Sequence, residues 1–160
     1  MSDAPVVTVQ EWLEGVLASA GARAGSVHHE RGGDLYLTAA VAIPEAVLDR
    51  VRHVPHGKGM AGLAQVRREP VQTCNLLTDD TGRINPVARL VGGGAAAAIP
   101  VFRPRAEVYA VVGFAFEAEG EIPPERMRAL QFKASRASAG ARANGRASSS
   151  RRARFSACSI

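Results

Sequence analysis

Cysteine is scarce in the sequence, and long apolar runs are missing. Cys74 and Cys158 are the two cysteines among 160 residues, too few for a scaffold built on disulfides. The chain lacks a basic start followed by an apolar segment, and it has no apolar stretch of about 18 residues, so neither a signal peptide nor a membrane span is predicted. We therefore expect a cytoplasmic protein with no membrane partner.

Aromatic residues are also few, at 5% of the chain, so a core must be built mainly from Ala, Val, Leu and Ile. The 46% hydrophobic and 22% charged residues are ordinary values for a globular protein. A chain of this length can bury a sizeable core, and we expect one domain.

Acidic residues are missing from the last part of the chain. Residues 133–160 carry seven basic side chains and no acidic one, whereas the preceding 132 residues carry 13 basic and 15 acidic ones. We expect a folded domain over 1–132 and a tail over 133–160, whose Ala, Arg, Ser and Gly are typical of disorder. If the protein binds nucleic acid at all, only this basic tail has the charge to do so. It is either native or the product of a shifted reading frame in GC-rich DNA.

The first element predicted is an amphipathic helix over Val9–Ala20. Thr8 and Glu11 have the spacing of a capping box, and Gly21 can end the helix. Its apolar face consists of Trp12, Leu13, Val16 and Leu17. A final helix is predicted after Pro124. Its expected inward side chains are Met127, Leu130 and Phe132.

Alternating side chains predict a hairpin of two strands over Gly25–Glu30 and Asp34–Ala40, joined through a short Gly-rich turn. A short helix is expected from Pro44, since proline suits the first helical turn. Its expected inward side chains are Val47, Leu48 and Val51.

The stretch 54–102 organises the rest of the chain. Gly57 and Gly59 in HGKG suit a tight turn whose backbone angles other residues resist. A short helix over Met60–Val66 follows, and after Pro70 a strand begins that leads into a polar loop.

Two apolar runs, Ala95–Val101 and Glu107–Glu117, predict a second hairpin at the centre of an antiparallel sheet. Gly113 inside the second run indicates a bulge or a close approach of backbone. The side chains expected to be buried on these strands are Ile99, Val101, Val111 and Phe114.

Four segments, VPHGKGMAG, EPVQTCNL, AAIPVF and YAVVGFAF, occur in an order that resembles a GAF domain, the small sensor fold of bacterial signalling proteins. The resemblance covers roughly Val9–Leu130. It implies an α+β fold with a central antiparallel sheet of five or six strands, helices on both faces, and a ligand pocket beneath the polar loop. The candidate pocket residues are Met60, Cys74, Asn75, Thr78, Asp79, Asp80, Arg83, Asn85 and Arg89.

Other chemistry finds little support in the sequence. His28 and His29 are adjacent on a strand and so point to opposite faces, and His53 and His56 have no carboxylate or thiol at ligand spacing, so no metal site is predicted. Cys74 lacks a second cysteine in the domain, so we expect no catalytic residue. The residues that mark cyclic-nucleotide and bilin binders of the family are missing. We expect no cofactor, although a haem held by one His stays open.

The function expected is therefore a stand-alone sensory or regulatory module, not an enzyme, that binds an unidentified small molecule or acts as a dimerisation unit. The alternatives are an enzyme that resembles free methionine sulfoxide reductase and uses Cys74, and a nucleic-acid binder that uses the basic tail. Because the final helix fades after Phe132, we expect incomplete cover of Trp12, Leu13 and Val16. A homodimer through this first helix, or a tail that folds back, would cover them.

Overall fold

The computed structural model describes residues 7–78, 86–105 and 107–137. These residues form a six-stranded antiparallel sheet in the order β3-β2-β1-β6-β5-β4, with helices on both faces, which confirms the predicted α+β class. The elements in chain order are α1 (Val9–Ala20), β1 (Ala24–Arg31), β2 (Asp34–Val41), α2 (Glu45–Val51), β3 (His53–Val54), α3 (Gly59–Arg67), β4 (Val71–Thr73), the 3₁₀ helix η1 (Pro86–Val91), β5 (Ala96–Phe102), β6 (Val108–Ala115) and α4 (Pro124–Ser135).

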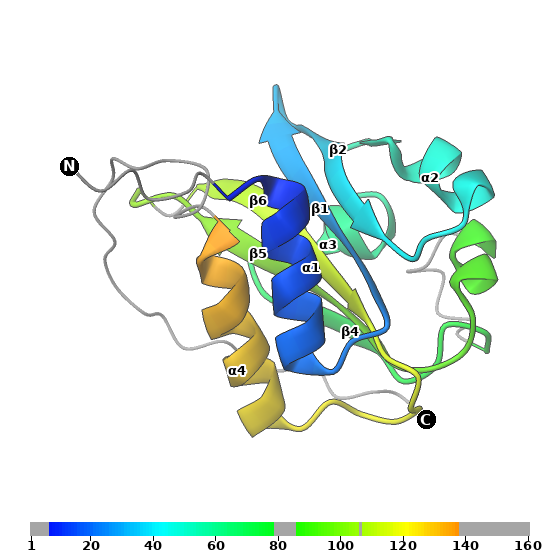
Figure 1. Ribbon diagram of the computed structural model, residues 1–160. Helices are drawn as coiled ribbons and strands as arrows, with labels where there is room; N and C mark the ends of the chain where they lie inside the picture. The colour runs from blue at the N-terminus through cyan, green and yellow to red at the C-terminus, as the bar shows by residue number, and fades with distance from the viewer. Residues whose placement is uncertain (1–6, 79–85, 106, 138–160) are drawn as a thin grey trace.

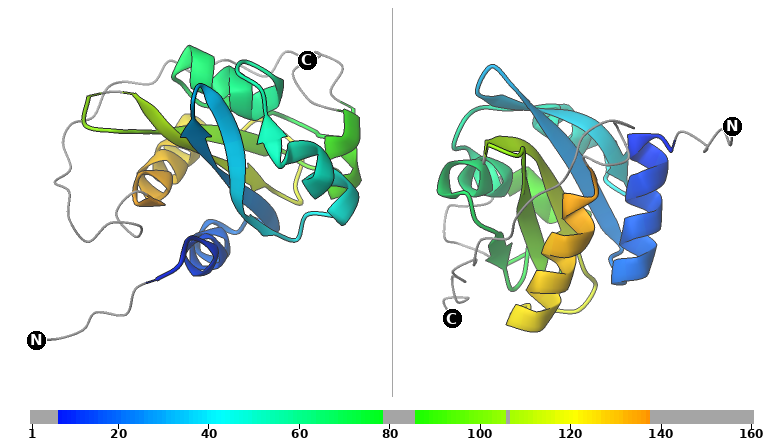
Figure 2. Two further views of the ribbon diagram at one scale, coloured as in Figure 1. Left: turned by 90° about the horizontal axis from the view of Figure 1, so that it is seen from above. Right: turned by 90° about the vertical axis from the view of Figure 1, so that its left-hand side faces the viewer.

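The molecule has three layers. The first and last helices, α1 and α4, lie side by side on one face of the sheet, while α2, α3 and η1 lie on the other (Figures 1 and 2). The two predicted hairpins, β1–β2 and β5–β6, are both present, and β6 joins them by pairing with β1. The chain therefore brings two separate pairs of strands into one continuous sheet.

The ends of α1 follow from its sequence. The side chain of Thr8 accepts a hydrogen bond from the amide of Glu11, and the carboxylate of Glu11 accepts one from the amide of Thr8 at 2.9 Å, which confirms the capping box. Gly21 ends the helix with φ of 68°, a left-handed conformation that glycine adopts without strain.

The expected incomplete cover of α1 is wrong for Leu13 and Val16. Leu13 and Val16 are buried by the chain itself, with 0% and 8% exposure. The reason is that α4 does not fade at Phe132 but continues to Ser135, and Ala134 is buried in the same cluster as α1. Phe132 is 64% exposed, so its expected inward position is also wrong. The small alanine takes the place that a bulky side chain was expected to fill.

Trp12 is partly buried against the same cluster. A homodimer through α1 stays a prediction, since Trp12 keeps some exposed surface. The disorder of residues 138–160 also stays a prediction because those residues lie outside the described part. Residues 133–137, which we assigned to the tail, are described: α4 runs to Ser135, and Ala134 and Ala137 are buried in the core.

The core lies between the sheet and the pair α1 and α4. Successive side chains of a strand point to opposite faces, and Ile99, Val101 and Phe114 point to this side with 1–2% exposure. Val111 is 1% exposed and faces the other side, towards α3. All four residues predicted to be buried on the central strands are confirmed.

The turn before α3 also agrees with the sequence. Gly57 and Gly59 have φ of 76° and 62°, so both adopt the left-handed region. The turn ends the connection from β3 and sets the direction in which α3 crosses the sheet. The first turn of α3 and part of α2 line the same cavity, which is the candidate site.

Candidate ligand-binding cavity

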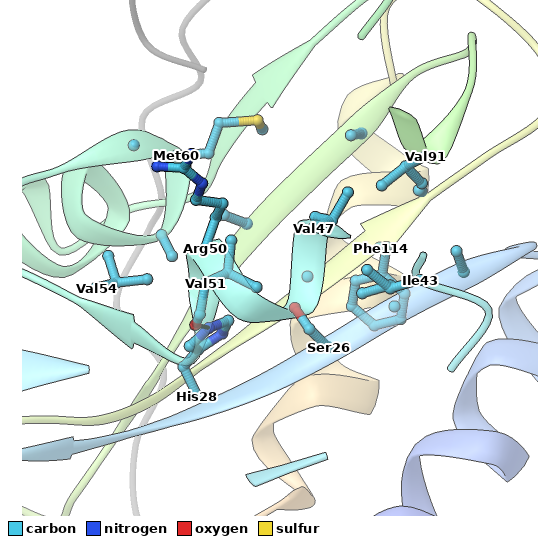
Figure 3. Close-up of a pocket in the computed structure, with 18 of the residues that line it drawn as sticks. Ser26, His28, Ile43, Val47, Arg50, Val51, Val54, Met60, Val91 and Phe114 are labelled. Carbon is cyan, nitrogen blue, oxygen red and sulfur yellow. Dashed lines mark hydrogen bonds between the residues drawn. The ribbon is translucent and has the colours of Figure 1, made fainter. Parts of the chain in front are cut away.

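A cavity of about 220 Å³ lies between the sheet and the helices α2 and α3 (Figure 3). Its floor is formed by β1, β5 and β6, and its walls by α2, the first turn of α3, Leu76 and the end of η1. Most of the surface that lines it is apolar. It lies on the face of the sheet opposite to α1 and α4.

The cavity exists because the side chains on this face of the three central strands are small. The floor positions are Ala24 and Ser26 on β1, Ala96 and Ala98 on β5, and Gly113 and Ala115 on β6. The opposite face of the same strands carries larger residues such as Val27, Ile99 and Val112. Small side chains leave space that larger ones would fill, so the difference between the two faces produces one packed layer and one hollow layer.

Gly113 contributes to this space most directly. A Cβ atom at its position would lie 2.8 Å from Oγ of Ser26, closer than atoms normally approach. The group that approaches is a side chain rather than the backbone that the sequence led us to expect, and no bulge occurs at this position. The absence of a side chain therefore leaves room for the hydroxyl of Ser26 at the floor of the cavity.

Apolar side chains close the other side. Ile43, Val47 and Val51 approach from the segment around α2, and Met60 comes from α3 (Figure 3). Val91 ends η1, and its carbonyl accepts a hydrogen bond from the guanidinium of Arg23, next to the start of β1. This bond ties η1 to the sheet at the edge of the cavity.

His28 is a polar side chain buried at the cavity, with 4% exposure. Its Nε2 donates to the carbonyl of Val51 at 2.8 Å, since a carbonyl can only accept. Burial lowers the pKa of His28 below its ordinary value, against a smaller raising effect of the bond to Val51. The ring is therefore neutral near pH 7, with Nδ1 as a hydrogen-bond acceptor.

The charged residues that line the cavity are all basic. Arg50 belongs to α2, Lys58 precedes α3, and no Asp or Glu is among the described residues that line the cavity. Neither Arg50 nor Lys58 forms an ion pair with any residue in the described ranges. His53 differs, because its Nε2 lies 2.7 Å from Oδ2 of Asp34. Hydrogen bonds from His53 and from the amide of His56 lower the pKa of Asp34.

The structure places the predicted pocket residues in different surroundings. Met60 lines the cavity. Cys74 and Asn75 follow β4 but do not line it, and Oδ1 of Asn75 accepts a bond from the amide of Leu77 at 2.8 Å. Thr78 and Arg89 are exposed and also lie outside the lining. The candidates outside the described residues are Asp79, Asp80, Arg83 and Asn85. Ligand contacts by any of these residues stay predictions.

The sequence predictions missed the small residues at the floor of the cavity and the two basic residues of its lining, Arg50 and Lys58. Ala95–Val101 was predicted as a strand, but which of its alanines share a face was not predicted. The signal was present, because Ala96 and Ala98 alternate with Ala97 and Ile99. Arg50 and Lys58 carried no signal, since only the folded chain brings α2 and the turn before α3 together.

The four histidines do not come together. His28 faces the cavity, and the ring of His29 lies on the other face, 4.9 Å from that of Tyr109, as their adjacent positions on a strand predict. His53 does have a carboxylate beside it, Asp34, from a strand far away in sequence. Within the described ranges, no group of three or more His, Cys, Asp or Glu side chains could hold a metal ion.

The architecture is that of a small α+β domain with helices on both faces of one sheet (Figure 1). The sequence model of the GAF domain matches residues 5–140, and the chain belongs to this family. No curated protein sequence matches it. None of the described helices has the length and apolar character needed to cross a membrane. Cytoplasmic localisation stays a prediction.

Solved structures share the fold at low sequence identity. A GAF domain/HD domain protein from Geobacter sulfurreducens aligns with a TM-score of 0.65 at 14% identity, over 85% of this chain and 93% of that one. A type II free methionine-R-sulfoxide reductase from Thermoplasma acidophilum aligns with a TM-score of 0.62 at 15% identity, over 82% and 86%. The corresponding reductase from Neisseria meningitidis gives 0.59 at 13%, over 82% and 80%.

These reductases correct one interpretation of the sequence. We expected a protein that is not an enzyme, but enzymes are among the structures with this fold. At these identities the similarity shows the fold alone. The fold therefore gives no ground for excluding an enzyme.

Proposed function

We propose that the protein is a GAF-type regulatory module that binds a small molecule in the cavity between the sheet and α2. The observation that carries this proposal is the difference between the two faces of the central strands. Large side chains fill one face, whereas Ala96, Ala98 and Gly113 leave the other hollow. An apolar cavity with a few polar groups is the usual form of a small-molecule site.

The ligand acts by its different affinity for two states of the walls. The cavity is closed by short elements, α2 and η1, which contact each other and which a ligand would touch directly. A ligand that binds the closed arrangement more tightly shifts the population towards it. At 100 times its dissociation constant, it would also stabilise the folded chain by about 2.7 kcal/mol.

The test is a thermal-shift screen of small molecules with about ten non-hydrogen atoms, followed by ¹⁵N NMR of each hit with the full chain. We expect shifts of the amide resonances of Ser26, Ala98 and Gly113. Ala96→Leu, which fills the cavity, should abolish them. The proposal fails if no hit shifts these amides, or if the hits shift them equally in Ala96→Leu.

A second candidate function is reduction of free methionine sulfoxide. The reductases that share the fold favour it, and Cys74 supplies a sulfur directly after β4. The reaction converts the sulfoxide to the sulfide, oxidises two thiols to a disulfide and releases the oxygen as water. Turnover with an added dithiol, lost in Cys74→Ser, supports this candidate. No turnover with fully reduced protein would eliminate it.

A further inference from the structure

The cavity has two chemically different ends. From this difference, and on the premise of the proposed function, we propose that the ligand is a small monoanion with an apolar body, a carboxylate of about ten non-hydrogen atoms. A dry cavity of about 150 Å³ holds a benzene molecule, so about 220 Å³ holds a body only slightly larger.

One end of the cavity is apolar. Ile43 and Val47 lie on the same side of it as Val91, and Leu76 and Ala96 complete this end (Figure 3). No charged side chain stands among these residues. A hydrocarbon or aromatic group would remove apolar surface from water on both partners, which is the main favourable term of binding in such a site.

The other end is basic. Arg50 extends from α2 in the direction of Met60, on the opposite side of the cavity from Ile43 and Val91 (Figure 3). Lys58 also lines the cavity, and as the N-cap of α3 it stands two residues before Met60 in the chain. Neither cation forms an ion pair with a carboxylate of the described residues. Two positive side chains in the lining, without such a partner there, favour an anion and repel a cation.

The first turn of α3 adds to this preference. Gly59, Met60 and Ala61 line the cavity, and the first intrahelical bond runs from the amide of Gly62 to the carbonyl of Lys58. No side chain caps this end of the helix. The amides of the first turn thus carry the positive end of the helix dipole at the cavity, where an anionic group would be stabilised.

Polar groups between the two ends can orient the ligand. The hydroxyl of Ser26 lies between Val47 and His28 in Figure 3 and can donate to a carboxylate oxygen. His28 is held by its bond to Val51, so it offers only the acceptor Nδ1. Nδ1 suits a hydroxyl or amino substituent of the ligand rather than its carboxylate.

Size excludes larger anions. Sites for drug-sized ligands have volumes of about 300–1,000 Å³, so a nucleotide or a tetrapyrrole does not fit a cavity of 220 Å³. The apolar end excludes small, fully hydrated ions such as inorganic phosphate, because burial of such an ion there would have no apolar gain to offset its desolvation. A compact carboxylic acid meets both limits.

The experiment compares three head groups on each of two bodies. The probes are phenylacetate, 2-phenylethanol and 2-phenylethylamine, and their branched analogues 4-methylpentanoate, 4-methylpentan-1-ol and 4-methylpentylamine. Affinities are measured with the full chain at pH 7 from amide shifts of Ser26, Ala96 and Gly113. We expect the carboxylate to bind about tenfold more tightly than the alcohol of the same body, and the amine to bind most weakly. This difference should shrink with added salt.

Charge variants identify the source of the preference. Arg50→Gln and Lys58→Gln should each weaken carboxylate binding about two- to fivefold, the range for an exposed charge pair, and leave alcohol binding unchanged. The matched control is Arg67→Gln, since Arg67 lies in the last turn of the same helix α3 and does not line the cavity. It should bind every probe like the wild type.

The outcomes separate the two proposals. If the alcohol binds at these amides as tightly as the carboxylate, or if Arg50→Gln and Lys58→Gln bind the carboxylate like the wild type, the anion preference is wrong while the cavity remains a binding site. If none of the six probes shifts these amides, the anion proposal is overturned. If the wider thermal-shift screen also yields no cavity binder, the proposed function fails with it.

Discussion

Substitution of one alanine should stabilise the protein while the same change at the next residue destabilises it. Ala96 lines the cavity and packs beside Leu76, whereas Ala97 packs in the core between the sheet and α4, although some of its atoms also reach the cavity lining. Both are nearly buried, with 6% and 2% exposure, and both lie on β5. The same Ala→Leu change at the two positions therefore compares the two faces of one strand.

The magnitudes follow from the space available. Ala96→Leu adds three carbons, which fit a cavity of about 220 Å³. At about 0.8 kcal/mol for each buried carbon the gain is about 2.4 kcal/mol, less about 0.5–1 kcal/mol for the lost side-chain freedom. We expect Ala96→Leu to raise the free energy of unfolding by about 1–2 kcal/mol. Ala97→Leu overpacks the core and should lower it by about 1–3 kcal/mol.

Urea denaturation measures both changes, with Trp12, the single tryptophan, as the fluorescent probe. The midpoint of Ala96→Leu should rise and that of Ala97→Leu should fall, with little change of the m-value. The reasoning is refuted if Ala96→Leu loses more than about 1 kcal/mol, because the cavity would then be closed in solution.

The remaining predictions concern the core, the turn, pH and assembly. Phe114→Ala should lower the free energy of unfolding by about 3–5 kcal/mol in the same assay, since Phe114 is 2% exposed; a loss under about 1 kcal/mol would contradict its burial. Gly59→Ala should cost about 1–2 kcal/mol because of its φ of 62°, whereas Gly15→Ala, inside α1, should gain about 0.5–1 kcal/mol; equal effects would show that the turn is not strained. Because burial lowers the pKa of His28, the unfolded chain binds more protons than the folded one below about pH 6.5, so stability should fall from pH 7 to pH 5, less steeply in His28→Gln; identical slopes would contradict this origin. In sedimentation, a dimer through α1 should dissociate in Trp12→Glu, and a wild type that is monomeric at every concentration would end the dimer prediction.

Local signals were enough to predict most of the fold. Thr8 and Gly21 determine the two ends of α1 through hydrogen bonds within a few residues, so the sequence contains all the information needed. The same holds for the hairpins, whose period of two is visible along each strand. β3 was missed because it has only two residues, His53 and Val54, and exists only through its pairing with β2.

The site was harder to predict because it depends on contacts between distant segments. The resemblance to the family directed attention to the polar loop, and among the candidates that the structure describes Met60 alone lines the cavity. The hollow face arises from alanines on strands 70 residues apart in sequence, such as Ala24 and Ala96, paired through β6. No local pattern reveals that these small residues meet.

The last helix shows the same limit. In the sequence, the apolar pattern of the final helix fades after Phe132, which suggested an uncovered α1. Ala134 and Ala137 nevertheless reach the core, because a close approach of the chain lets small side chains replace large ones. A prediction based only on large apolar residues therefore underestimates how far a helix is buried where its neighbour contacts it through alanine.

The central claim is that the cavity beside α2 holds a small molecule. The most direct measurement is native mass spectrometry of the wild type and of Ala96→Leu, both purified from the protein's own host. We predict one bound compound of about ten non-hydrogen atoms per wild-type chain, and none on Ala96→Leu. A wild type without any bound compound, or an equal amount of the same compound on Ala96→Leu, would contradict the claim.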